Sequence, residues 1–134
     1  MIEYSFNKDE NILYLKRIGD IFLDDILNII DELNSQMENC RQIYILQDTS
    51  ESSMKYNTDD LNPMILEFKQ RIKNFDIVRI ANYTEDPVET AVAFVFEELT
   101  LQIDKFHHKT FSTYENAKLW LKTKMIKDED SLKE

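Results

Sequence analysis

The sequence predicts an α/β domain: a mixed five-stranded sheet with helices packed on it, in the order β-β-α-β-α-β-α-β-α. In the second half, two strand-like runs, residues 77–81 and 106–111, alternate with two helices whose starts are well marked. Asp86 precedes a proline and then a glutamate at the third helical position, and Ser112 opens a Ser-x-x-Glu capping box. Short strand-to-helix connections of this kind predict parallel strands.

The first half begins with a hairpin. Residues 2–6 alternate between apolar and polar side chains, residues 7–11 form a polar turn cluster, and residues 12–18 make a second strand. The short link makes this pair antiparallel, so the first strand runs against the others. From Asp20 the apolar spacing becomes helical, and this helix is expected to end near residues 38–39.

The middle of the chain carries a strand and a hydroxyl-rich segment. Residues 43–46 are a continuous apolar run, typical of a strand covered on both faces. Residues 48–53 are expected to form a loop at the carboxyl end of that strand. The second helix is expected to start at residues 62–63, an Asn-Pro pair, although Thr58 could cap an earlier turn.

The third helix is expected to run from Pro87 to about Gln102 and to be apolar over more than half its circumference. One stripe is sufficient to dock it on the sheet: Val88, Ala91, Val92, Val95 and Leu99. Outside this stripe lie Phe94, Phe96 and Leu101, joined by Phe106 from the next strand. These four residues predict an apolar surface that forms a homodimer contact, lines an apolar-ligand cleft or is buried within the domain.

The last helix is expected to pack through Ala117, Trp120 and Leu121, with residues 127–134 as a charged flexible tail. The chain of 134 residues is long enough to bury one core and has no linker composition inside it. We therefore expect a single domain over residues 1–126.

Charge and composition exclude several classes of function. The 26 acidic and 16 basic residues give a net charge of −10, and the basic residues are scattered, so binding to nucleic acid or to anionic lipid is not expected. No apolar run approaches the roughly 20 residues that cross a bilayer, so no membrane insertion is expected. A lone Cys40 fits a reducing compartment, and we expect a cytoplasmic protein.

Catalytic and cofactor signals are weak. Gly19 is the one glycine, whereas loops that bind phosphate groups need several, so no nucleotide cofactor is expected. His107 and His108 are adjacent on a strand and point to opposite faces, which disfavours a metal site. Cys40 is expected at the amino edge of the sheet, away from a catalytic position. Glu97 and its neighbour Glu98 point about 100° apart and are interpreted as a solvated face.

The element order and three segments resemble the STAS or anti-sigma-factor-antagonist-like group, and more closely its uncharacterised SpoIIAA-like branch. Residues 43–49 resemble the group's central strand ending in an aspartate, residues 78–83 the strand before its third helix, and residues 111–121 its closing helix. The resemblance implies an α/β fold that acts by binding a partner. Signalling members are phosphorylated within an Asp-Ser-Ser-Gly sequence; here residues 48–54 contain no glycine, which departs from that pattern.

Together these observations predict a non-enzymatic regulatory or accessory domain that contacts a protein partner. Its contact or phosphorylation site would be the loop containing Asp48, Thr49, Ser50, Ser52 and Ser53. The same residues could instead form a solvated turn. The alternative function is binding of a small apolar ligand such as a lipid or fatty acid, which rests on the eight Phe and five Met residues. A small hydrolase or transferase is a lesser alternative.

Overall fold

The computed structural model describes residues 1–132. Five strands and four α-helices follow one another in the predicted order, with one short 3-10 helix added before the second helix. The elements are β1 (Ile2–Asn7), β2 (Ile12–Ile21), α1 (Leu23–Gln36), β3 (Gln42–Met54), η1 (Thr58–Asp60), α2 (Leu61–Arg71), β4 (Ile77–Tyr83), α3 (Pro87–Thr100), β5 (Phe106–Phe111) and α4 (Tyr114–Leu132).

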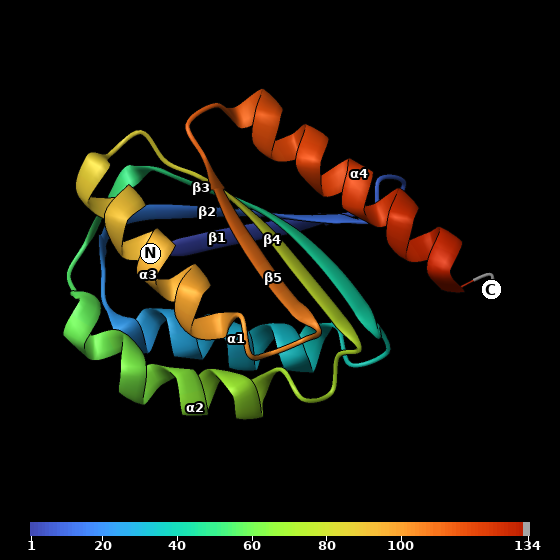
Figure 1. The fold of residues 1–134 in the computed structure, drawn as a ribbon, viewed down its shortest axis with the longest axis horizontal. Coiled ribbons are helices and arrows are strands. Elements are labelled where there is room, and N and C mark those ends of the chain that lie inside the picture. The colour runs from blue at the N-terminus through green and yellow to red at the C-terminus, as the bar shows by residue number, and fades with distance from the viewer. Residues whose placement is uncertain (133–134) are drawn as a thin grey trace.

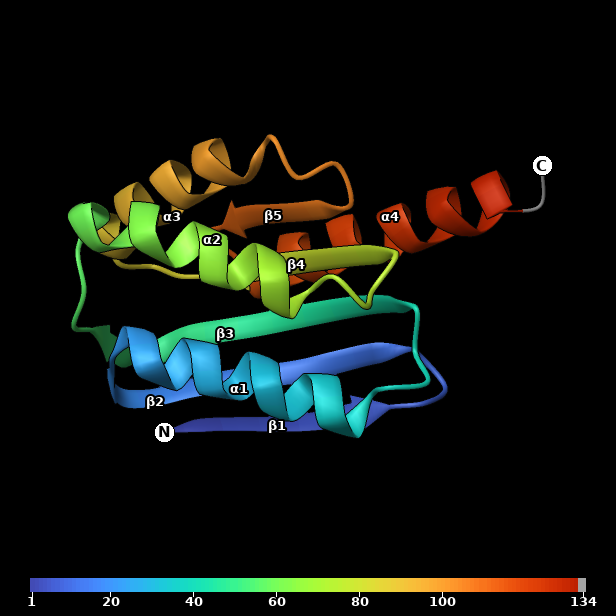
Figure 2. The same ribbon diagram turned by 90° about the horizontal axis from the view of Figure 1, so that it is seen from below.

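The strands form one sheet in the spatial order β1-β2-β3-β4-β5. β1 pairs antiparallel with β2, and every other neighbouring pair is parallel, which confirms the predicted fold class. Helices α1, α2 and α3 cover one face of the sheet, whereas α4 lies alone across the other face (Figures 1 and 2).

Each face of the sheet has its own core, because successive side chains of a strand point to opposite faces. On the face covered by α1 to α3, the core contains Leu13, Leu15, Ile29, Leu33, Ile43, Ile45, Phe68, Ile72, Val78 and Phe106. On the α4 face, it contains Ile12, Tyr44, Leu46, Ala81, Ala117, Leu121 and Met125.

The segment expected as a loop is a strand. β3 continues to Met54 because β2 is longer than expected and supplies a parallel partner as far as Ile21. The pairing changes register between Lys16 and Ile18, which lie opposite Asp48 and Glu51, so β3 has one extra residue there. This arrangement is a β-bulge, which bends a strand and re-aims its side chains.

The start of α3 was predicted correctly, but its buried stripe was not. The Asp86 side chain accepts hydrogen bonds from the backbone N–H groups of Val88 and Glu89, at 2.8 and 3.4 Å. Of the predicted stripe, Val92 and Leu99 are buried or half-buried, whereas Val88, Ala91 and Val95 are exposed. The other covered positions of the helix are Glu89, Thr90, Ala93, Phe96, Glu97 and Thr100. Both stripes have helical spacing, and nearly every position between them is apolar, so the pattern could not choose between them.

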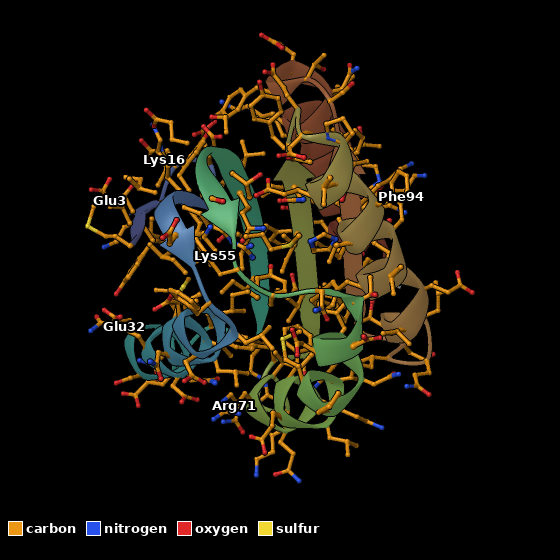
Figure 3. All side chains as sticks on the ribbon, turned by 90° about the vertical axis from the view of Figure 1, so that its left-hand side faces the viewer. Glu3, Lys16, Glu32, Lys55, Arg71 and Phe94 are labelled. Atoms are coloured by element: carbon orange, nitrogen blue, oxygen red, sulfur yellow. The ribbon has the colours of Figure 1, made fainter. Side chains whose placement is uncertain are left out.

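The predicted apolar surface divides in two. Phe94 and Leu101 are 55% and 70% exposed, and Phe94 points away from the sheet (Figure 3). Phe106 is fully buried, with its ring centroid 4.7 Å from that of Phe68 and 5.8 Å from that of Phe96. Phe96 and Phe106 are therefore part of the domain's own core.

The helix starts differ in detail from the predictions. Asn57 caps the 3-10 turn that leads into α2, with its side-chain oxygen accepting from the N–H of Asp59 at 2.9 Å, so the helix does not begin at residues 62–63. At α4, Thr113 rather than Ser112 accepts from the N–H of Asn116, at 3.3 Å.

The predicted flexible tail is, as far as Leu132, the last part of α4; residues 133–134 lie outside the described part of the chain. Asp128 is buried there and accepts hydrogen bonds from Nη2 and Nε of Arg79 at 2.9 and 3.1 Å. It also accepts one from the Tyr44 hydroxyl at 2.9 Å. The charge pattern was read as solvation, but this carboxylate faces a cation on the sheet.

Candidate functional site

A row of polar side chains crosses three parallel strands, from the middle of β3 to the carboxyl ends of β4 and β5. Gln47 on β3 lies beside Asn82 on β4, which lies beside Thr110 on β5. The Gln47 amide nitrogen donates to the Asn82 carbonyl oxygen at 2.8 Å, and the Asn82 amide nitrogen donates to the Thr110 hydroxyl at 3.4 Å. These side chains belong to the face covered by α1 to α3, where the preceding same-face residues on β3 and β4 are Ile45 and Ile80 and the one on β5 is His108. Buried polar groups need partners, and here they satisfy one another.

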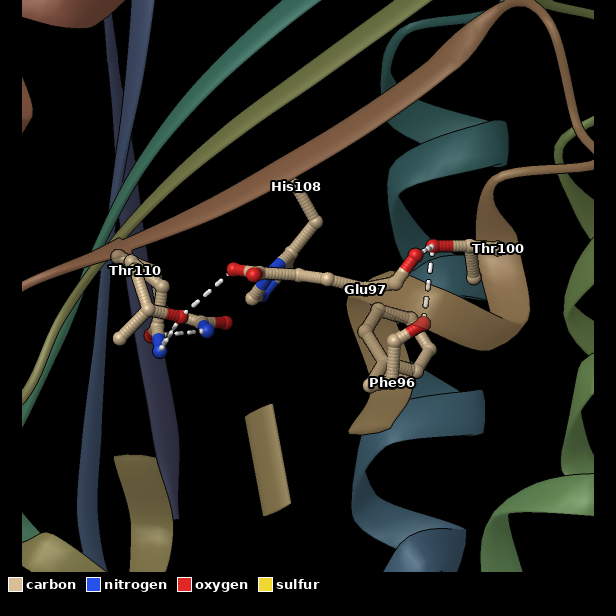
Figure 4. Close-up of polar contacts among 7 residues, drawn as sticks. Phe96, Glu97, Thr100, His108 and Thr110 are labelled. Carbon is tan, nitrogen blue, oxygen red and sulfur yellow. Dashed lines mark hydrogen bonds and ion pairs between the residues drawn. The ribbon is translucent and has the colours of Figure 1, made fainter. Parts of the chain in front are cut away.

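Glu97, on α3, contacts Thr110, the last residue of this row. Its Oε1 atom accepts a hydrogen bond from the Thr110 hydroxyl at 2.9 Å and lies 3.2 Å from Nδ1 of His108 (Figure 4). A carboxylate only accepts, so this contact assigns the imidazole proton to Nδ1. The expectation that Glu97 belongs to a solvated face is therefore wrong for this residue, whereas Glu98 is exposed.

The surroundings of His108 favour the neutral form of its side chain. Burial lowers the pKa of its imidazole, and the hydrogen bond to Glu97 only partly opposes that effect. Its ring also meets the Phe96 ring edge to face, with the centroids 5.1 Å apart. The neighbouring hydroxyl of Thr110 donates to Glu97 rather than to His108, so the three groups lack the nucleophile–base–carboxylate order of a catalytic triad.

A cavity of about 110 Å³ lies between the sheet and the three helices on this face. Its walls are mainly apolar, with contributions from Leu15, Ile29, Ile45, Met54, Met64 and Phe68. Gln47, Asn82 and His108 supply polar groups to the lining, as do Arg17 and Glu89. An apolar pocket with a few convergent polar groups is the usual form of a small-molecule site.

Arg17 reaches the cavity from β2, beside the β-bulge. Its Nη1 atom donates to the Tyr56 hydroxyl at 3.1 Å. Its Nε atom is buried and has no acceptor among the described residues. Neither Arg17 nor Tyr56 is among the site residues predicted from the sequence.

The predicted partner residues are spread around the end of β3. Thr49 is buried, donates its hydroxyl to the Tyr83 carbonyl at 2.9 Å and lines the cavity. Ser52 is half-buried and donates to the Thr49 carbonyl at 2.9 Å, while Ser50 and Ser53 are exposed. Asp48 accepts from the N–H of Ser50 at 2.8 Å and lines a separate hollow of about 310 Å³ with Glu3, Tyr14, Lys16 and Tyr114.

The remaining candidates do not converge. His107 is exposed, and burial of part of its ring, followed by the nearby charge of Arg79, lowers the pKa of the imidazole. Cys40 is half-buried just before the amino end of β3. Over residues 1–132, no group of three or more His, Cys, Asp or Glu side chains is placed to hold a metal ion. No helix in the same part of the chain is long and apolar enough to cross a membrane.

The sequence contains a partial signal for the polar row of Gln47, Asn82 and Thr110. Gln47, Asn82 and Thr110 each lie at or near the carboxyl end of a predicted strand, and Gln47 and Asn82 each share a face with an isoleucine two residues earlier. Three such positions on neighbouring parallel strands meet at one edge of the sheet. The contributions of Glu97 and Arg17 depend on the rotation of α3 and on the β-bulge, which no local pattern shows.

Comparisons with known proteins support the architecture. No family model matches the sequence, and no curated protein matches it. Among solved structures, an uncharacterised protein of the DUF3478 family from Shewanella loihica PV-4, described as having a SpoIIAA-like fold, superposes with a TM-score of 0.57. The two are 20% identical, and the match covers 90% of this chain and 92% of the other. The chain therefore has a SpoIIAA-like α/β fold, as its resemblance to that group implied.

Proposed function

We propose that this chain is a non-enzymatic accessory domain that binds a small apolar molecule between its sheet and helices α1 to α3. The observation that carries this proposal is the cavity of about 110 Å³ with mainly apolar walls. An engineered cavity of about 150 Å³ lined by aliphatic and aromatic residues remains dry and binds benzene, so this space is on the scale that holds a small ring or a short alkyl chain.

The lining residues suit an adaptable site. Met54 and Met64 both contribute, and methionine side chains adjust to irregular ligands because they are unbranched and polarisable. These residues support the proposal, which the number of Phe and Met residues also favours. Phe96 is the one residue of the predicted apolar surface that lines this cavity.

A thermal-shift experiment with 1-hexanol and benzene tests the proposal. A ligand that binds only the folded state raises the midpoint of unfolding according to its concentration relative to its Kd. Ala93 lines the cavity, so Ala93→Leu should fill it and reduce the shift. Ala91 is exposed on the same helix, and Ala91→Leu is the matched control that should retain the full shift. No shift of the unmodified protein with either probe would contradict the proposal.

A second candidate function is regulation through protein–protein contact, in the cytoplasm, as a homodimer or with another protein. It is favoured by the exposure of Phe94 and Leu101 on α3 and of the Ser50 and Ser53 hydroxyls at the end of β3. Native mass spectrometry of the unmodified protein and of Phe94→Ser would test the homodimer. A dimer that is lost in the variant supports this surface, and a monomer in both contradicts it. Intact-mass analysis of protein from its own cells would detect a phosphate on the serines.

A further inference from the structure

We infer that the ligand of this cavity carries an anionic head group, most simply a carboxylate, and that Arg17 binds it. This inference rests on the proposed function, because it concerns the polar end of the same cavity. It starts from the Nε–H of Arg17, which is buried without an acceptor among residues 1–132. Leaving a buried donor unsatisfied is costly, particularly on a charged group, and native structures rarely do so without a reason.

The charge of Arg17 is also uncompensated within the described chain. Ion pairs join Lys16, Lys55, Arg41, Arg71, Arg79, Lys118 and Lys122 to carboxylates, but none involves Arg17. A protein with 26 acidic and 16 basic residues has carboxylates to spare. An unpaired guanidinium beside an apolar cavity is therefore a feature that a bound anion would explain.

The carboxylates nearest to the cavity are already engaged with other donors. Glu89 lines it but accepts a hydrogen bond from the Thr84 hydroxyl at 3.1 Å. Glu97 is occupied by Thr110 and His108, at 2.9 and 3.2 Å. Neither carboxylate forms an ion pair with Arg17, although Glu89 lines the same cavity, so the guanidinium still lacks a direct contact that a bound anion would supply.

Tyr56 adds a second donor at this point. Its oxygen accepts from Nη1 of Arg17, which leaves its own O–H available for another acceptor. Guanidinium groups hold carboxylates through parallel N–H donors and retain their charge when partly buried. A short-chain monocarboxylate would place its oxygens on Arg17 and Tyr56 and its alkyl chain among the apolar walls.

The experiment compares two ligands with the same chain, hexanoate and methyl hexanoate, by isothermal titration calorimetry near neutral pH. Hexanoate is expected to bind at least tenfold more tightly, because a hydrogen bond to a charged group is worth about 1.5–3 kcal/mol and about 1.4 kcal/mol is tenfold in Kd. Arg17→Met keeps most of the side-chain volume and should abolish that preference. Lys16→Met removes one positive charge on the opposite face of the same strand and should leave the preference unchanged.

The outcomes separate the two proposals. If neither ligand binds, the cavity is not a ligand site and both proposals fail. If both bind equally to the unmodified protein, apolar binding stands and the anionic head group is refuted. If Arg17→Met does not fold, the ratio between hexanoate and its methyl ester on the unmodified protein still decides the question. If Lys16→Met loses the preference as fully as Arg17→Met, the effect is one of overall charge and the assignment to Arg17 is overturned.

Discussion

Replacement of Asp128 by Asn should destabilise the protein far more than its position near the chain end suggests. The Asp128 carboxylate accepts three hydrogen bonds, two from Arg79 and one from Tyr44. The side chains of Asp128 and Arg79 are each 11% exposed, so solvent screens the pair only weakly. Nη1 of Arg79 is already buried without a partner, and the neutral amide would leave the whole guanidinium uncompensated.

The magnitude follows from these contacts. Removing one partner of a buried ion pair costs about 3–5 kcal/mol. The amide oxygen of Asn can keep at most the two hydrogen bonds that end on Oδ2, from Tyr44 and from Nε of Arg79, so we expect a loss of about 2–4 kcal/mol. Urea unfolding followed by circular dichroism measures it. Asp130→Asn, on the same helix and exposed, is the control and should change stability by less than about 0.5 kcal/mol.

The pH dependence gives a second check on the same reasoning. Burial opposes ionisation of Asp128, but the hydrogen bonds from Arg79 and Tyr44 outweigh it and lower the pKa of the carboxyl group. The stabilisation is therefore present above the unfolded value of about 3.9 and is lost as the pH falls through the folded value. The difference between the unmodified protein and Asp128→Asn should shrink accordingly in acid.

A small effect would refute this argument. If Asp128→Asn lowers the free energy of unfolding no more than Asp130→Asn does, the ion pair does not hold the last turns of α4. The prediction of a flexible tail would then be supported. A double variant, Arg79→Met with Asp128→Leu, sharpens the test. Because a buried pair can often be replaced by apolar residues at little cost, the double variant should be more stable than Asp128→Asn alone.

Three further perturbations test other parts of the structure. His108→Asn should remove part of the loss of stability on acidification. Because the pKa of His108 is lowered in the folded protein, the unfolded chain binds the proton first below about pH 6.5, and the free energy of unfolding then falls by up to about 1.4 kcal/mol per pH unit. Urea unfolding of both proteins at about pH 7 and about pH 5.5 measures the difference. Leu121→Ala should cost about 2–5 kcal/mol because Leu121 is fully buried under α4, whereas Leu119→Ala, exposed on the same helix, should cost less than about 1 kcal/mol in the same assay. Phe94→Ser should leave the thermal midpoint within a few degrees, since 55% of that residue is exposed, and a large drop would show that its ring is part of the core.

The architecture could be predicted because its signals are local. Hairpin alternation, the cap at Asp86 and the apolar run at residues 43–46 each specify a type of element, and the short connections specify parallel pairing. Errors arose where the outcome depended on a distant partner. The strand from Asp48 to Ser53 exists because β2 extends beside it, and Asp128 is buried because Arg79 lies on the sheet beneath α4.

The candidate site was harder to predict for the same reason. Its polar row joins residues 35 and 28 positions apart in the sequence, and its carboxylate comes from a helix whose rotation the apolar pattern left open. No local pattern singles out Arg17, because a lone arginine on a strand is usually solvated. Arg17 is of interest because its buried Nε–H has no acceptor among the described residues, and only the three-dimensional contacts show this.

The strand order has a consequence for how the chain acquires its structure. Every strand pairs only with the strands next to it along the chain, so each βα unit can add to an existing edge without waiting for a later segment. Each new strand then closes only a short loop, so the entropic cost of each step is small. This favours rapid folding and stepwise assembly during synthesis from the N-terminus. α4 comes last, closes the second face and docks its carboxylate on a strand already in place. We expect a chain released before α4 to keep the α1–α3 face and expose the other, which hydrogen exchange on a truncated protein would show.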